Sequence, residues 1–257
     1  MLEEKLNALV SKQATNNIAY QIEYQGKVYT HRQDHIFRSA SITKIPLCLS
    51  ALKKGELLDE NPRLDASKKV MGSGVLHSME DTRTMTLHDL VTIALIVSDN
   101  TASNVLMDYV GFDQMDKDFK EWCLRDTELK SHYMNMNADP NKMYNIATAS
   151  GMMTALNLIY EDNEYISQPI RDRMKRLLRQ QQFNDRVGGT LDDGGEENHI
   201  TVSSKSGTID KLEHDVGIFK MDKEILKFAV LSQGWPTNLD GRQFLIEVGH
   251  LLKAEME

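Results

Sequence analysis

The sequence has little cysteine and little proline, and each scarcity excludes a class of protein. Two cysteines in 257 residues, Cys48 and Cys123, cannot build the disulfide framework of a small secreted scaffold. Both lie in helix-like, partly apolar stretches, which favours free buried thiols over a disulfide. No HExxH motif, cysteine pair or carboxylate cluster indicates a metal site, and we expect no cofactor. Five prolines and fifteen glycines also leave no room for a low-complexity region.

Long apolar runs and an excess of basic residues are missing too. No segment approaches the roughly 20 apolar residues that a membrane-spanning helix needs. The net charge of −8 argues against nucleic-acid and membrane partners, because both require a basic surface. The first twelve residues carry no export-signal pattern, so we expect a cytoplasmic protein, or an extracellular one if such a signal was removed. One basic cluster is predicted to be the solvated face of a helix: Arg171, Arg173, Lys175, Arg176 and Arg179.

Hydrophobic periodicity predicts strands near both ends of the chain and helices between them. The expected strands cover residues 18–24, 27–31, 200–206, 216–221 and 226–232. The expected helices begin near Leu2 and cover residues 41–52, 87–97, 101–109, 112–122, 152–160, 168–181 and 244–256. Residues 124–145 have no clean period and are expected to form a long structured loop, and residues 192–198 form a turn cluster.

This order of elements predicts an α/β (α+β) fold, with a mixed antiparallel sheet built from both termini, flanked by helices, and an inserted all-helical region. We expect a single domain over residues 1–257. Its sheet part comprises residues 1–57 and 199–257, and its helical part comprises residues 58–198.

The first chemical candidate is the S-x-x-K sequence formed by Ser41 and Lys44. Residues three apart share a helix face, so the Lys44 amine can reach the Ser41 hydroxyl. A lysine deprotonates a serine only when burial or nearby positive charge lowers its pKa. Ser50 and Lys53 repeat the spacing, but nine residues of helix place the two serines on opposite faces. Only Ser41 is expected at a strand-to-helix entry, where its backbone N–H is free to bind an oxyanion.

Two further short motifs lie later in the chain. The Ser-Asp-Asn tripeptide at Ser98–Asn100 lies between two expected helices, where such side chains ordinarily cap the second helix. The stretch Lys205–Thr208 ends an expected strand. Its glycine permits a ligand backbone to approach closely, and its lysine offers a charge for a substrate carboxylate. Each motif alone has an ordinary structural explanation.

Together the three motifs occur in the order S-x-x-K, S-D-N and K-[ST]-G, nearly the set typical of class A β-lactamases and penicillin-binding proteins. The chain resembles class A β-lactamases, most closely over residues 37–44, 98–104 and 205–207. This resemblance implies a sheet packed beside an all-helical region, with the site at their junction. It also implies a serine hydrolase of the β-lactamase type, which passes through an acyl-enzyme on Ser41.

The resemblance assigns a role to each motif residue. Ser41 would attack the substrate carbonyl, Lys44 would help to take its proton, and Ser98 would pass a proton to the leaving nitrogen. Asn100 would hold the amide side chain of the substrate. The remaining substrate contacts would come from one strand, where Lys205 and Ser206 bind a carboxylate, Gly207 adjoins the substrate, and the N–H of Thr208 completes the oxyanion hole with that of Ser41.

One departure from the class A pattern concerns the loop before residue 148. Aligning Thr127, Leu129 and Asn137 with that loop places Tyr133 where class A enzymes carry the glutamate that activates the deacylating water. A phenol with a pKa near 10 is a poor base at neutral pH, so we expect rapid acylation and slow release. Tyr133 and Asn137 are then expected only as loop contacts, and Glu128, the nearest carboxylate, is out of register. The loop looks more like a branch of β-lactamase-related hydrolases that lacks the glutamate.

Three smaller expectations concern residues outside the motifs. The disulfide of the resembled family is expected to be absent, because Cys48 occupies one of its positions and Val91 the other. His214 and the following aspartate invite a triad interpretation, but we expect a structural role because Ser41 already has Lys44 as its partner. The resemblance places the segment 72–74 near the mouth of the site.

The expected substrate is a small molecule, either a β-lactam or a related amide or ester. A D-alanyl-D-alanine peptidase or an esterase would need the same residues, and a penicillin-binding sensor domain that is acylated once is a further alternative. The sequence leaves the native substrate and the oligomeric state open.

Overall fold

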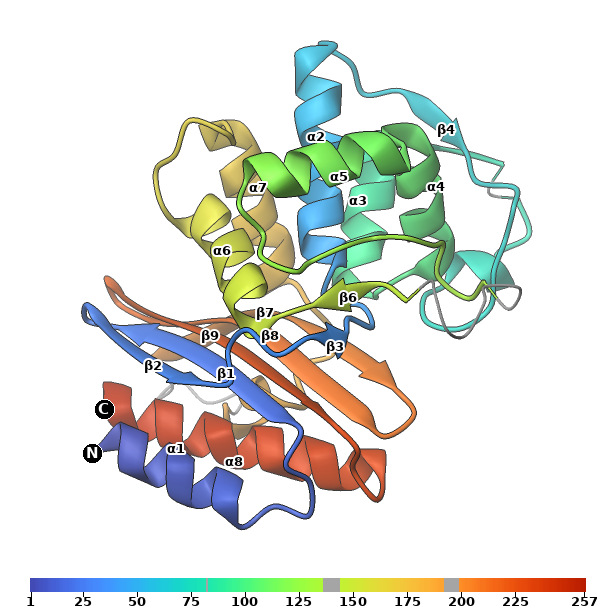
Figure 1. Cartoon of the computed structure of the whole chain (residues 1–257). Helices are drawn as coiled ribbons and strands as arrows, with labels where there is room; N and C mark the ends of the chain where they lie inside the picture. Colours follow the sequence, from blue (N-terminus) through green and yellow to red (C-terminus); the bar gives the residue numbers. More distant parts are fainter. Residues whose placement is uncertain (82, 136–143, 192–198) are drawn as a thin grey trace.

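The two ends of the chain meet in one antiparallel sheet (Figure 1). In the computed structural model, which describes residues 1–81, 83–135, 144–191 and 199–257, the strands lie in the order β2-β1-β9-β8-β7. Their bounds are β1 Ile18–Tyr24, β2 Lys27–His31, β7 Ile200–Ile209, β8 Leu212–Met221 and β9 Glu224–Gln233. The pairing of β1 with β9 joins the N-terminal hairpin to the C-terminal strands, and β7 is left as an edge strand.

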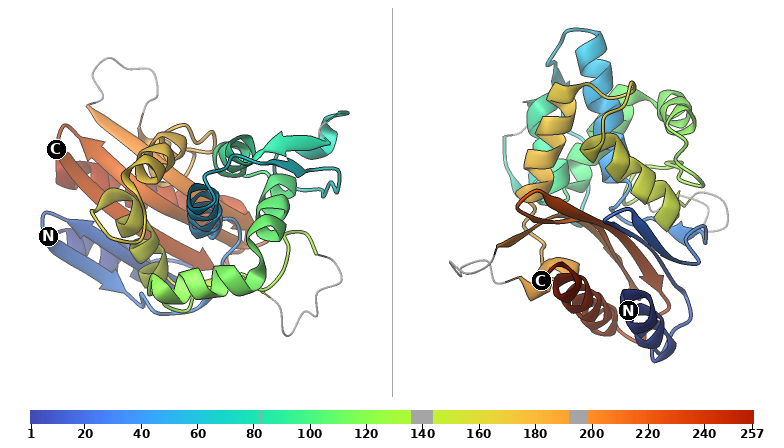
Figure 2. Two further views of the ribbon diagram at one scale, coloured as in Figure 1. Left: turned by 90° about the horizontal axis from the view of Figure 1, so that it is seen from above. Right: turned by 90° about the vertical axis from the view of Figure 1, so that its left-hand side faces the viewer.

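Alternation along the strands gives the sheet two apolar faces. Ile18, Tyr20 and Val230 belong to a core that includes the helices α1 (Leu2–Ser11) and α8 (Asn238–Met256). Ala19 and Leu231, on the opposite face, belong to the larger core of the helical region. Because successive side chains of a strand point to opposite sides, the same strands serve both cores. Figure 2 shows α1 and α8 covering one side of the sheet and the other helices stacked on the other.

The helical region is built around a central helix, α2 (Lys44–Leu57), whose residues from Lys44 to Leu52 are all buried. Around it lie α3 (Leu87–Ile96), α4 (Asn100–Val110), α5 (Phe112–Glu121), α6 (Ala149–Tyr160) and α7 (Gln168–Arg179). Short elements complete the chain: β3 Phe37–Arg38 with β6 Ile146–Ala147, β4 Arg63–Asp65 with β5 Thr84–Thr86, and the 3-10 turns η1 Leu76–Ser78 and η2 Val187–Thr190. Side-chain caps start four of the helices, with Thr86 on α3, Asp99 on α4, Thr148 on α6 and Thr237 on α8.

The predicted fold class is confirmed, and the differences from the sequence prediction are local. The helix expected over 41–52 begins at Lys44 and continues through Gly55 to Leu57. The strand expected from residue 216 begins four residues earlier, because Glu213, His214 and Asp215 are fully buried despite their polarity. Their side chains find polar partners, which the hydrophobic pattern of a sequence does not reveal. The turn cluster 192–198 lies outside the described residues.

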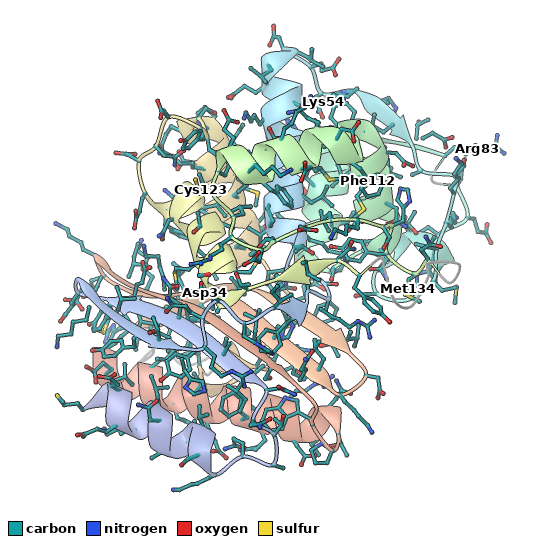
Figure 3. All side chains as sticks on the ribbon, in the orientation of Figure 1. Asp34, Lys54, Arg83, Phe112, Cys123 and Met134 are labelled. Carbon is teal, nitrogen blue, oxygen red and sulfur yellow. The ribbon has the colours of Figure 1, made fainter. Side chains whose placement is uncertain are left out.

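Two predictions of exposure were wrong in part. Cys48 is a free buried thiol as expected, but the free thiol of Cys123 is exposed, at a residue with φ of 55° just after α5 (Figure 3). Within the basic cluster, Arg171 is buried and contacts Asp162 at 2.7 Å rather than facing solvent. In the part of the chain that the structure describes, no helix combines the length and apolarity required to cross a membrane.

Candidate functional site

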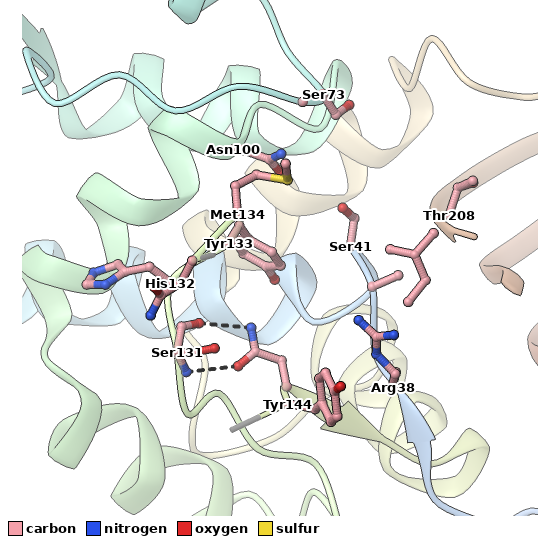
Figure 4. Close-up of a pocket in the computed structure, with 15 residues that line it drawn as sticks. Arg38, Ser41, Ser73, Asn100, Ser131, His132, Tyr133, Met134, Tyr144 and Thr208 are labelled. Atoms are coloured by element: carbon pink, nitrogen blue, oxygen red, sulfur yellow. Dashed lines mark hydrogen bonds between the residues drawn. The ribbon is translucent and has the colours of Figure 1, made fainter. Parts of the chain in front are cut away.

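A cavity of about 490 Å³ opens where the edge strand β7 meets the helical region (Figure 4). Its volume lies within the range usual for small-molecule sites. Four of the residues singled out from the sequence line it, namely Ser41, Asn100, Tyr133 and Thr208. The remaining described lining residues are Arg38, Ala40, Gly72, Ser73, Ser131, His132, Met134, Asn135, Tyr144, Asn145 and Ile209. The expectation that the segment 72–74 lies near the mouth is therefore confirmed for Gly72 and Ser73.

Ser41 lies in the tight turn that leads from β3 into α2. The backbone carbonyl of Ser41 accepts a hydrogen bond from the Lys44 N–H at 3.2 Å, and the preceding residue, Ala40, has a left-handed φ of 45°. A non-glycine residue in that region is strained, so the turn is held by its surroundings. The half-buried Ser41 side chain points toward the cavity (Figure 4).

The strand β7 passes directly beside this turn. A Cβ atom added to Gly207 would lie 3.2 Å from the Ser41 backbone nitrogen and 3.2 Å from the Ala40 Cβ. A side chain at residue 207 would therefore push the strand away from the turn. The glycine of the third motif thus keeps the backbones of β7 and Ser41 close together, a contact within the protein, whereas the sequence had suggested the approach of a ligand backbone.

Lys44 is fully buried at the floor of the site, one turn along the chain from Ser41. Its Nζ donates hydrogen bonds to the Ser98 carbonyl oxygen at 2.6 Å and to Asn100 Oδ1 at 2.9 Å, and it lies 3.1 Å from Ser98 Oγ. The first and second motifs are thus in direct contact. Among the described residues, no hydrogen bond joins the Lys44 amine to the Ser41 hydroxyl.

The electrostatic surroundings of Lys44 favour its neutral form. Burial, and then the positive charge of Lys205, hold the pKa of Lys44 well below its ordinary value. A neutral amine has two N–H groups, which match the two oxygens at 2.6 and 2.9 Å. Its lone pair then remains for the hydroxyl at 3.1 Å or for an incoming proton. In its neutral form, the Lys44 amine would therefore be able to accept a proton at this position.

The Ser98–Asn100 turn combines a structural and a chemical part. Asp99 caps α4 through a hydrogen bond from the Ala102 N–H at 2.8 Å, and its other oxygen accepts from the N–H groups of Val75 and Leu76. Helix capping, the ordinary explanation of this motif, thus applies to its central residue. The two outer residues, Ser98 and Asn100, face Lys44 instead, and Ser98 holds a left-handed φ of 56°.

The third motif supplies a second buried lysine. Lys205 is fully buried, and its Nζ donates to the Ser206 carbonyl oxygen at 2.8 Å. Burial, and then the nearby Arg186 guanidinium, lower the pKa of Lys205 to about 7. Lys205 therefore changes charge near neutral pH, while Ser206 beside it is also buried.

A network of buried hydrogen bonds and an ion pair, which the sequence did not suggest, positions the side chain of Thr208. Its hydroxyl donates to Glu213 Oε2 at 2.8 Å and accepts from the Arg186 guanidinium. Glu213 is fully buried, and Arg186 Nε donates to it at 2.9 Å. Asn238 Nδ2 satisfies the other Glu213 oxygen at 2.9 Å. Arg186 and Glu213 come from distant parts of the chain, so only the folded arrangement of β8 against η2 brings them to this strand.

Tyr133 covers the buried lysine from the loop side. Its ring centroid lies 4.6 Å from Lys44 Nζ, and its hydroxyl is 3.0 Å from Thr43 Oγ1. Asn104 fixes the backbone of Tyr133 with two hydrogen bonds, of 2.8 and 3.0 Å. Burial raises the pKa of the phenol well above its ordinary value, so the group stays protonated and cannot act as a base near neutral pH.

The other loop residues considered from the sequence lie elsewhere. Glu128 forms an ion pair with Lys130 and lines a different cavity, between α5 and the start of the loop. Asn137 lies outside the described residues. The Asn145 side chain closes the loop, because its Oδ1 accepts from the N–H groups of Lys130 and Ser131 at 2.8 and 3.1 Å.

His214 has a structural position, as predicted. It is fully buried in β8, and Nδ1 accepts from the Ser232 N–H at 3.0 Å, so Nε2–H donates to the Arg38 carbonyl oxygen at 2.9 Å. Burial lowers the pKa of His214 to about 4, which keeps the ring neutral. Within the described ranges, no three histidine, cysteine, aspartate or glutamate side chains gather closely enough to hold a metal ion.

Comparison with known proteins concerns the family and the fold. The model of the beta-lactamase enzyme family matches residues 1–256. A β-lactamase structure from Sphaerobacter thermophilus is 28% identical, with a TM-score of 0.86, covering 98% of this chain and 94% of that chain. The structure of PBP-A is 21% identical, with a TM-score of 0.86 and coverage of 99% and 95%. A β-lactamase structure from Chitinophaga pinensis is 15% identical, with a TM-score of 0.88 and coverage of 100% and 99%. A search of curated proteins gave no match.

Proposed function

This chain belongs to the beta-lactamase enzyme family and is a serine hydrolase of the β-lactamase and penicillin-binding type, and on that premise we propose that it forms an acyl-enzyme on Ser41 with β-lactams or related amides and esters. The observation that carries the proposal is the contact of the Lys44 amine with Ser98 and Asn100 beneath the cavity that Ser41 lines. A mutant of PBP-A, which shares the fold, has been captured as an acyl-enzyme complex with penicillin G.

The acylation step uses the neutral lysine. The Ser41 oxygen bonds to the substrate carbonyl carbon as its proton passes to the Lys44 lone pair. The negative charge that develops on the carbonyl oxygen is stabilised by the backbone N–H groups of Ser41 and Thr208, a contribution of typically about 3 kcal/mol for such a donor. The C–N bond then breaks, and the leaving nitrogen receives a proton through Ser98, which Lys44 can recharge at 3.1 Å.

Release of the acyl group is expected to be slow. Hydrolysis of the acyl-enzyme requires a base that activates water beside Ser41. The residue aligned with that base is Tyr133, a protonated phenol whose hydroxyl is hydrogen-bonded to Thr43. The described residues that line the cavity include no aspartate or glutamate, and Glu128 faces another cavity. The described lining of this cavity therefore offers no carboxylate to activate water for the second step.

The proposal is tested by intact-mass measurement after brief exposure to benzylpenicillin. We expect a persistent adduct in the wild type and none in Ser41→Ala. Ser50→Ala is the matched control, because Ser50 opens the duplicate S-x-x-K spacing but is bonded to Asp118 inside the helical core. An adduct that survives in Ser41→Ala would refute the assignment of the nucleophile. Fast turnover of a chromogenic cephalosporin would refute slow release.

The protonated phenol at Tyr133 also favours a second candidate, a D-alanyl-D-alanine peptidase or esterase, because such an enzyme needs the same acylation machinery. Rates measured with a D-alanyl-D-alanine peptide, a simple ester and a penicillin separate the two. A peptide or ester that turns over while the penicillin adduct persists favours the second candidate.

A further inference from the structure

Arg38 places a fixed positive charge in the cavity, three residues before Ser41. In the two-residue strand β3 the neighbouring Phe37 is buried and Arg38 is exposed, so the alternation of the strand turns the guanidinium toward the cavity. The backbone of Arg38 is held on two sides. It pairs with Ile146 of β6, and its carbonyl oxygen accepts from His214 Nε2 at 2.9 Å.

The guanidinium itself is oriented by stacking. The Arg38 Cζ lies 4.2 Å from the centroid of the Tyr144 ring, and both residues line the cavity. A guanidinium stacked on an aromatic face keeps its in-plane N–H groups available, and two of them match the two oxygens of a carboxylate. Among the described residues, no carboxylate lies within 4.0 Å of Arg38, although the chain carries 38 acidic residues.

The surroundings of Arg38 differ from those of the two lysines of the site. Lys44 and Lys205 are fully buried and have intramolecular partners, whereas Arg38 is exposed. Arg38 is also the one lysine or arginine among the described lining residues, which include no aspartate or glutamate. Figure 4 shows Arg38 and Tyr144 on the side of Ser41 away from Ser73 and Asn100.

We propose that Arg38, stacked on Tyr144, determines specificity by binding a carboxylate on the acyl half of the substrate. This inference rests on the proposed function, since it concerns the substituent on the carbonyl side of the C–N or C–O bond that breaks when Ser41 is acylated. A carboxylate at Lys205 and one at Arg38 would be bound by different elements, β7 and β3. The favoured substrate is therefore an amide or ester with a second negative charge, carried on its acyl side.

The test compares two penicillins that differ by one carboxylate, benzylpenicillin and α-carboxybenzylpenicillin. The second-order rate constant for acylation of Ser41 is measured for each by quenched intact-mass time courses. We expect the ratio of the two constants, carboxylated over parent, to fall about tenfold in Arg38→Gln, the effect of losing one charge-assisted contact. Arg38→Lys keeps the positive charge but lacks the planar guanidinium, so its ratio should lie between those of the wild type and Arg38→Gln. Tyr144→Leu removes the stacking surface and should lower the same ratio.

Arg83→Gln is the matched control, because Arg83 is exposed, does not line the cavity, and its loss changes the net charge equally. It should retain the wild-type ratio. An equal ratio in the wild type and Arg38→Gln, or an equal fall in Arg83→Gln, would overturn the inference. Arg38 would then serve only to hold the Tyr144 segment.

A second readout separates this inference from the proposed function. Phenylacetamide and its α-carboxy derivative are the acyl fragments of the two penicillins without the reactive ring, and their binding is measured by NMR titration. Tighter binding of the anionic fragment to wild type than to Arg38→Gln supports the subsite even if neither penicillin acylates Ser41. Equal binding of that fragment to both proteins rejects it even if both penicillins react.

Discussion

The two walls of the cavity are built in different ways. One wall consists of Ser41, Asn100 and Thr208, each at the end or edge of a helix or strand, with buried charged groups behind it. The other consists of the loop residues Tyr133 and Tyr144. The Tyr133 ring lies over the Lys44 amine and its backbone is bonded to Asn104, whereas the Tyr144 ring lies against the Arg38 guanidinium. Under the proposed function, the first wall would supply the groups for acylation, and the second would govern how long the acyl group stays bound and which acyl group fits. In this proposal the acylation residues lie at the ends or edges of helices and strands, whereas the residues that affect release and specificity lie on the loop.

The strongest test of the first wall is Lys44→Met. The substitution removes the base and leaves Ser98 and Asn100 without their shared partner, so we expect the acylation rate with benzylpenicillin to fall by about 10³-fold or more. Lys53→Met is the matched control from the duplicate motif, since Lys53 pairs with Asp118 and Glu121 away from the cavity. A Lys44→Met rate within tenfold of the wild type would mean that another group takes the Ser41 proton.

The strongest test of the second wall is Tyr133→Glu. A carboxylate in place of the protonated phenol would supply a base for water, so we expect release of the benzylpenicilloyl group to accelerate by about 10²-fold. The lifetime of the adduct, measured by mass spectrometry, reports the effect. Tyr133→Gln is the control with the same shape but without a base. Equal acceleration in both variants would show that opening the loop, and not a base, limits release.

A smaller effect is expected from the titration of Lys205. Its pKa is lowered to about 7, so the lysine is charged below that pH and progressively neutral above it. Capture of a substrate carboxylate should therefore weaken as pH rises through about 7, by up to about tenfold, and acylation at low substrate concentration should fall with it. Lys205→Arg retains its charge and should move this alkaline limb to higher pH. An unchanged limb in Lys205→Arg would assign it to another group.

The smallest expected effect concerns the support behind Thr208. Glu213→Gln keeps the shape but removes the charge that pairs with Arg186 and Arg242, so we expect a loss of about 1–3 kcal/mol in unfolding free energy. We also expect a severalfold slower acylation, because the Thr208 N–H is less firmly placed. Chemical denaturation and acylation kinetics measure the two quantities. Loss of stability with an unchanged acylation rate would show that the network serves the fold alone.

The sequence was sufficient to predict the elements whose order and periodicity are local. The hairpin of β1 and β2 was predicted with the observed bounds, because Gln25 and Gly26 form a typical turn pair between two strand-like segments. In the structure these two residues adopt the left-handed φ values of 49° and 73° that such a turn requires. The start of β8 was not predicted, because Glu213 and His214 resemble polar surface residues until their distant partners are known. The spacing of hydrophobic residues therefore locates a strand only where the buried residues of that strand are hydrophobic.

The same limit applies to the site. The three motifs were found because each is a short local pattern, and the structure brings Lys44, Ser98 and Asn100 into contact. Arg38 and Arg186 were not found, because an isolated arginine has no local signature of function. Arg38 owes its place to pairing with β6, and Arg186 owes its place to the packing of η2 near β8.

The left-handed backbone at Ala40 and at Ser98 has a consequence for engineering. Each such residue raises the energy of the folded chain by about 1–2 kcal/mol relative to a relaxed conformation. This strain is already present in the folded protein before substrate binds. Ala40→Gly would relieve it and should raise the melting temperature. The relaxed turn would no longer fix the direction of the neighbouring hydroxyl, so the more heat-resistant enzyme is expected to be the slower one.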